Sequence, residues 1–151
     1  AGAGIYRRDF FEQVGIFDED FFIFAEDVDI NMRGQLQGFK CIYLPEAKVY
    51  HIGTATVGLY SDRYIYLCKR NDIFVLIRNY SLRMYFRHLW TILKHQFNDI
   101  KYFTYRGQGI ILFKSKLDAF KMLLPMLFRR FRIQSSRTVP DSEIETLIIK
   151  S

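Results

Sequence analysis

The stretch 14-VGIFDEDFFIFAEDVDINMRGQLQG-38 changes character at its middle. Its first part alternates phenylalanines with acids, which is too crowded for a clean helix, so we expect a loop that packs over a cleft. From Asp27 onward Val28, Met32 and Leu36 recur at i, i+4 and i+8, and Gly38 ends the pattern. This spacing predicts a helix of about three turns. Asp29 and Arg33 are spaced for an ion pair on it.

The segments on either side of this stretch favour alternating strands and helices. Residues 1–7 (AGAGIYR) fit a short buried strand, and residues 8–14 place apolar side chains on one helical face before Gly15, a C-cap candidate. Residues 39–45 and 47–53 are β-rich runs separated at Pro45 and Glu46. We therefore expect an α/β arrangement for residues 1–59.

The remainder of the chain has a helical pattern. Residues 64–80, 82–97 and 113–133 carry apolar residues at helical spacing, with Arg and Lys on the other face. Pro125 is expected to kink or break the third of these segments. The sequence thus predicts a basic, amphipathic helical region over residues 60–133, followed by a mobile or weakly docked tail over residues 134–151.

Composition bounds the possible classes of protein. The chain has 151 residues, half of them apolar, which is enough for one domain with a core. Cys41 and Cys68 have no disulfide or zinc spacing and are expected to be reduced thiols. No leader peptide and no long uncharged apolar run is present, which favours a cytoplasmic protein. Residues 1–59 contain five Lys/Arg and nine Asp/Glu, and residues 60–151 contain 17 and seven.

A specific combination of motifs resembles family-2 glycosyltransferases, in particular bacterial rhamnosyltransferase-like members. It consists of G-x-F-D-E-x-F-F, E-D-x-D, an Arg four residues after the last Asp, and P-E-A-x-V-x-H, all within residues 2–53. The resemblance implies the acceptor-side part of a GT-A (Rossmann-like) catalytic domain, joined to the basic, mainly α-helical C-terminal region. It also implies transfer with inversion from a nucleotide-sugar, with dTDP-rhamnose as one candidate donor. The acceptor would be a lipid-linked saccharide used in cell-surface polysaccharide.

The resemblance also indicates what such an enzyme needs beyond these residues. The D-x-D sequences at residues 18–20 and 27–29 belong to the acceptor-side motif, and no D-x-D follows an expected strand. The chain begins at Ala1, within an expected strand. We therefore expect a piece of a longer protein that lacks the nucleotide-binding half and is inactive alone. A divalent cation, Mg or Mn, would be held mostly by that half.

Asp27 is the candidate catalytic base. Inverting transfer needs a carboxylate that accepts the proton of the acceptor hydroxyl as its oxygen attacks the anomeric carbon. Asp27 begins the expected helix, where the dipole favours an ionised carboxylate, and the family's E-D pair implies the same residue. The alternative is that Asp27 only caps the helix. Glu26 is expected to orient the acceptor sugar.

Two further sets of site residues remain open to a second interpretation. His51 ends an expected strand and is a candidate metal ligand by resemblance, or an interior histidine bonded to a carbonyl. Phe22 and Phe24 either stack on the acceptor or belong to the core.

The basic half suggests a membrane surface. Arg129, Arg130 and Arg132 lie among phenylalanines, a composition typical of helices in the interface of anionic lipid. Alternatively, these faces pack on the catalytic domain and leave the charges in water. We expect a cytoplasmic protein, peripheral on the inner face of the cell membrane. A nucleic-acid-binding module is the weaker reading, because no RRM, KH or helix-turn-helix pattern is present and the front half is acidic.

Overall fold

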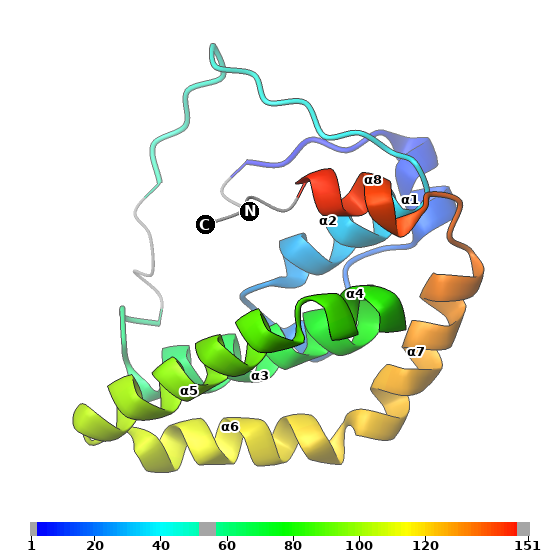
Figure 1. Cartoon of the computed structure of the whole chain (residues 1–151). Helices are drawn as coiled ribbons and strands as arrows, with labels where there is room; N and C mark the ends of the chain where they lie inside the picture. Colours follow the sequence, from blue (N-terminus) through cyan, green and yellow to red (C-terminus); the bar gives the residue numbers. More distant parts are fainter. Residues whose placement is uncertain (1–2, 52–56, 148–151) are drawn as a thin grey trace.

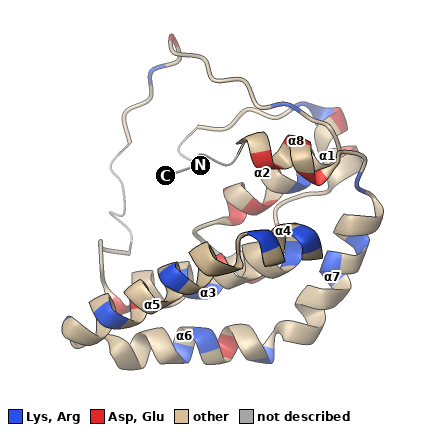
Figure 2. Ribbon diagram, viewed as in Figure 1, with Lys and Arg blue, Asp and Glu red and all other residues tan. Residues whose placement is uncertain are grey.

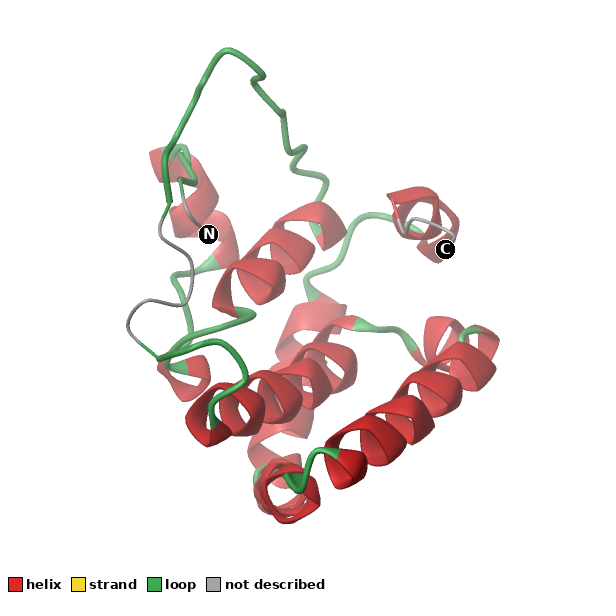
Figure 3. Cartoon of the chain, turned by 90° about the vertical axis from the view of Figure 1, so that its left-hand side faces the viewer, coloured by secondary structure: helices red, strands yellow, loops and turns green. Residues whose placement is uncertain are grey.

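The computed structural model describes residues 3–51 and 57–147, and every regular element within these ranges is a helix (Figures 1 and 3). The elements in chain order are α1 (Arg8–Val14), η1 (Glu19–Phe21), α2 (Glu26–Leu36), α3 (Asp62–Asn79), α4 (Leu82–Arg87), α5 (Leu89–Tyr105), α6 (Gly109–Lys121), α7 (Leu123–Ser135) and α8 (Asp141–Leu147). Their bounds agree with the predicted helices near residues 8–14, 27–36 and 64–80.

The central element is α3, which packs against α6, α7 and α2 (Figure 1). One core cluster contains Phe21 from η1, Phe74 and Val75 from α3, Ala119 from α6 and Met126 from α7. Residues from both sides of the boundary expected at residue 59 therefore share one core cluster.

Local sequence signals set the helix ends. The Ser61 side chain accepts a hydrogen bond from the Tyr64 N–H and caps α3, and Ser81 caps α4 through the Met84 N–H in the same way. Gly15 has φ of +85° and its N–H donates to the Phe11 carbonyl, which ends α1 as predicted. Pro125 lies in the first turn of α7, directly after the break at Met122, so the predicted interruption is confirmed.

The expected α/β fold is wrong for the described residues, which contain no strand and hence no Rossmann-like GT-A sheet. Residues 3–7 and 39–51 form no regular element and include a turn at Pro45 and Glu46, and the last two residues of the second β-rich run lie outside the described ranges. Ile42 and Tyr50 are 80% and 98% exposed. Extended chain becomes a strand only by pairing with a neighbour, and β propensity reflects packing in a sheet, which these segments do not have.

Of the tail expected to be mobile or weakly docked, residues 136–147 dock onto the helices. The N–H groups of Thr138 and Val139 both donate to the Leu36 carbonyl at the end of α2. In α8, Ile144 is buried in a cluster with Leu36, Met84 and Ile133. The tail has little periodicity because it docks through one short helix and a few specific hydrogen bonds.

Candidate active site

The loop that leads into α2 has an unusual backbone. Phe22, Phe24 and Ala25 have φ of 61°, 71° and 62°, a region that non-glycine residues rarely adopt. Such a conformation persists only where the surrounding structure holds it. The loop therefore requires an anchor, and α3 supplies one.

Asn71 of α3 is this anchor. Its fully buried side-chain amide donates to the carbonyls of Phe21, Ile23 and Phe24 over 2.9, 2.9 and 2.7 Å. The neighbouring Arg70 donates to the Asp20 carbonyl over 2.8 Å. Sequence reasoning missed Asn71, although a polar residue on the apolar face of an amphipathic helix was a signal for it.

Asp27 is the second residue of α2. The N-cap is Ala25, whose side chain cannot cap, so Asp27 does not occupy the N-cap position itself. Its carboxylate is half-buried and accepts a hydrogen bond from the Val28 N–H over 2.9 Å. Glu26, Asp27 and Asp29 lie in the first turn, where the helix dipole stabilises negative charge. Asp27 is thereby kept as a carboxylate.

A cavity of about 620 Å³ lies beside this turn. It is lined by Glu26 together with Gly4, Ile5, Tyr6, Phe11 and Phe17. Of the three residues predicted to bind an acceptor, the structure brings only Glu26 into the cavity. The Phe24 ring packs 5.0 Å from Tyr64, and the exposed Phe22 ring lies under Arg63.

Tyr6 is a residue of the site that the sequence did not single out. Its ring contacts Phe10, Phe11 and Phe17, with centroids 5.1–5.9 Å apart. Burial raises the pKa of the Tyr6 hydroxyl, a hydrogen bond with Asn31 lowers it in part, and the negative charges of Asp27 and Glu26 raise it further. The hydroxyl therefore stays protonated near the two carboxylates, where it can donate a hydrogen bond.

A buried ionic network lies behind the first turn of α2. Arg33 Nε lies 2.9 Å from Asp29 Oδ2, the pair that the i, i+4 spacing predicts. The other Asp29 oxygen accepts from Asn79 over 2.9 Å and lies 3.4 Å from Arg78 Nε. Both carboxylate oxygens of Asp29 thus bind cationic or amide donors, which compensates for its complete burial.

The same network reaches the start of the aromatic loop. Arg33 donates to the Val14 and Ile16 carbonyls over 2.7 and 2.9 Å. Arg78 forms a 2.9 Å ion pair with Asp18. Residues from α1, the loop, α2 and α3 are therefore joined through buried charge, and this fixes the turn that carries Glu26 and Asp27.

His51 lies at the end of the exposed extended segment. Within residues 3–51 and 57–147, no group of three His, Cys, Asp or Glu side chains is placed to hold a metal ion. The described donors thus do not form a cation site, and the metal role of His51 stays a prediction.

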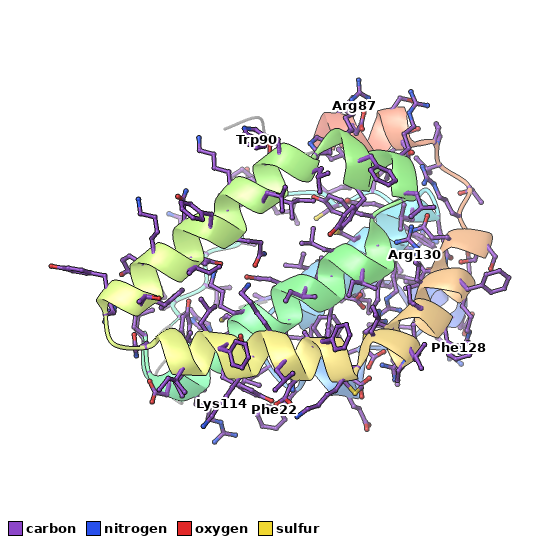
Figure 4. All side chains as sticks on the ribbon, turned by 60° about the horizontal axis from the view of Figure 1, so that its bottom comes forward. Phe22, Arg87, Trp90, Lys114, Phe128 and Arg130 are labelled. Carbon is purple, nitrogen blue, oxygen red and sulfur yellow. The ribbon has the colours of Figure 1, made fainter. Side chains whose placement is uncertain are left out.

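The three arginines predicted to face a membrane do not share one environment. Arg129 forms ion pairs with Asp18 and Asp20. Arg130 donates to the carbonyls of Ile77 and Tyr80 and lies between α7 and α3 (Figure 4). Both side chains hold α7 onto the rest of the molecule, and only Arg132 is exposed.

Comparison with known proteins identifies the family of the chain. Residues 2–131 match the family model described as glycosyl transferase family group 2. A curated N-acetylglucosaminyl-diphospho-decaprenol L-rhamnosyltransferase of Mycobacterium tuberculosis is 34% identical over 77 residues, in strain CDC 1551 / Oshkosh and in strain ATCC 25618 / H37Rv. The alignment covers 45% of this chain and 25% of that relative. No solved structure matches.

Proposed function

The chain belongs to glycosyl transferase family group 2 and is rhamnosyltransferase-like, and on this premise we propose that it carries the acceptor side of a sugar-transfer site with Asp27 as the catalytic base. The observation that supports this most strongly is the placement of Asp27. It lies at the positive end of α2, on a turn fixed by buried charge, beside a cavity lined by aromatic rings.

The chemistry assigned to Asp27 is proton acceptance. As the acceptor hydroxyl attacks the anomeric carbon, its proton passes to the Asp27 carboxylate, the bond from that carbon to the diphosphate oxygen breaks, and the diphosphate leaves with the electron pair. A correctly positioned base contributes roughly 10²–10⁴-fold to such a step. The ionic network around Asp29 fixes the position of Asp27.

The cavity fits the acceptor sugar. Tyr6, Phe11 and Phe17 provide aromatic faces against which the C–H face of a sugar ring can pack. Glu26 and the Tyr6 hydroxyl provide an acceptor and a donor for the sugar hydroxyls. We assign this role to Tyr6, Phe11 and Phe17 instead of Phe22 and Phe24.

The identities of the substrates are part of the proposal. The name of the relative specifies L-rhamnose as the sugar transferred and an N-acetylglucosaminyl-diphospho-decaprenol as its acceptor. We propose the same classes here: a nucleotide-sugar donor such as dTDP-rhamnose and a lipid-linked saccharide acceptor. The alignment spans only a quarter of that relative, so activity is to be sought in the full-length protein that contains this chain.

The test is to identify the product. Full-length protein is incubated with nucleotide-sugars and a polyprenyl-diphosphate-linked N-acetylglucosamine, and the product is analysed by mass spectrometry and by NMR of the anomeric centre. We expect a single added deoxyhexose with the opposite anomeric configuration to that of the donor. Retention of configuration, or transfer only to soluble acceptors, would contradict the proposal.

A further inference from the structure

The outer side of α6 carries a row of large apolar side chains. The α6 row consists of Ile110, Phe113, Leu117, Phe120 and Leu124, the last at the start of α7, and its members are 43–71% exposed. The spacing of 3, 4 and 3 residues places the first four on one face of α6, and Leu124 follows the break at Met122. Phe128 and Phe131 continue the pattern along α7 and are also exposed.

The α6 row faces away from the body of the protein. The buried residues of α6 are Leu112, Ser115 and Ala119, which lie on the opposite side of the helix and pack toward α3. Figure 4 shows the molecule with the side that carries α6 turned toward the viewer. Helices α5 and α7 also contact α6, but the exposure of the five side chains shows that the described residues leave the row uncovered.

The charge around the row is almost entirely positive. Residues 82–135, which form α4 to α7, contain 11 Lys and Arg residues, and their only acids are Asp99 and Asp118. Asp99 pairs with Lys69 over 3.0 Å, and Asp118 accepts a hydrogen bond from Tyr66 over 2.7 Å and also pairs with Lys121, whose side chain stays 65% exposed. Lys114 and Lys121 are exposed on the same helix as the row. Figure 2 shows this distribution, with Lys and Arg along α4 to α7.

Charge selects among the partners that could cover such a surface. A second copy of the chain would bring like charges together. A nucleic acid would satisfy the lysines but would leave five large apolar side chains in water. An anionic lipid surface matches both features, since phospholipid headgroups attract Lys and acyl chains accept Phe, Leu and Ile.

We propose that the α6 row is a membrane-docking surface, on which the apolar side chains enter the headgroup boundary of an anionic bilayer while Lys114 and Lys121 contact the headgroups. The helix would lie in the plane of the membrane, because the described residues include no helix long and apolar enough to cross it. This inference rests on the α6 row and does not depend on the proposed sugar transfer. Lys114 and Lys121 thus take the place of Arg129 and Arg130 as the expected contacts with lipid headgroups.

The experiment is sedimentation of the chain with vesicles, carried out at low salt with either neutral or anionic phospholipid. We expect binding to anionic vesicles that weakens as salt rises. The variant Phe113→Gln/Phe120→Gln should bind at least about 10-fold more weakly. The variant Lys114→Gln/Lys121→Gln should lose roughly 10- to 30-fold on anionic vesicles. All of these side chains are exposed, so the variants are expected to fold, and circular dichroism checks this.

The control variant is Ile42→Gln/Leu147→Gln, which changes two exposed apolar residues, one in the extended segment and one in α8, both across the molecule from α6 (Figure 1). It should bind as the wild type does. The proposal is overturned if the chain stays in the supernatant with anionic vesicles at low salt. It is equally overturned if the control loses as much binding as the α6 variant, or if the chain dimerises in solution and the Phe113/Phe120 change abolishes the dimer.

Discussion

Replacing Asn71 by Leu tests whether α3 holds the loop that positions the candidate base. The substitution keeps the size of the side chain and raises its helix propensity by a few tenths of a kcal/mol, but it removes both N–H donors from the carbonyls of Phe21, Ile23 and Phe24. Two lost hydrogen bonds contribute about 1 kcal/mol each, and carbonyls left buried without a donor add about 1–2 kcal/mol. We therefore expect the free energy of unfolding to fall by about 2–4 kcal/mol.

The loss is measured by urea unfolding, with Asn98→Leu as the matched control on the exposed surface of α5. The control should change stability by less than about 0.5 kcal/mol. Residues 22, 24 and 25 hold strained φ angles, so hydrogen exchange of the loop amides should speed up in Asn71→Leu before the helices exchange. A stability loss equal to that of the control, with loop exchange unchanged, would show that Asn71 is not the anchor.

Two further substitutions test the packing of α2 and the docking of α8. Gly34→Ala places a methyl group against the Phe10 ring, so overpacking of about 1–3 kcal/mol should outweigh the helix-propensity gain of about 1 kcal/mol; a variant that melts above the wild type would contradict this. Burial raises the pKa of Asp141, but hydrogen bonds from Ser81 and Arg137 lower it by more, so its folded-state pKa lies below the ordinary value. Its stabilisation is therefore present above the unfolded pKa of about 3.9 and is lost as pH falls through the folded pKa. Asp141→Asn should lower the melting temperature at pH 7 but not near pH 2; a difference that persists in acid would refute the assignment.

The sequence predicted those parts of the fold that depend on local periodicity. The helices at α1, α2 and α3, the Asp29–Arg33 spacing and the break near Pro125 all follow from signals a few residues apart. The family resemblance was also readable, because the motifs around Glu26 and Asp27 are specific, and the family match confirms it.

Features that depend on distant contacts were not predicted. Residues 39–51 have the composition of strands but lack a pairing partner among the described residues, so the strands predicted from composition do not form there. Arg130 looked like a surface charge within a basic cluster, whereas carbonyls of α3 and of the residue after it bind its guanidinium. Asn71 binds carbonyls that are 47–50 residues away in the sequence. Tyr6 comes close to Glu26 and Asp27 only when the helices pack.

The most direct measurement is the rate of sugar transfer by Asp27→Asn in the full-length protein, together with its affinity for the donor. Asp62→Asn is the matched control, since Asp62 begins α3 and accepts a hydrogen bond from Gln108 away from the cavity. We expect kcat to fall by about 100-fold or more for Asp27→Asn, because the base acts only as the acceptor oxygen attacks, while the donor Kd changes by less than about 3-fold. Transfer by Asp27→Asn above about a tenth of the wild-type rate would contradict the assignment of Asp27 as the base.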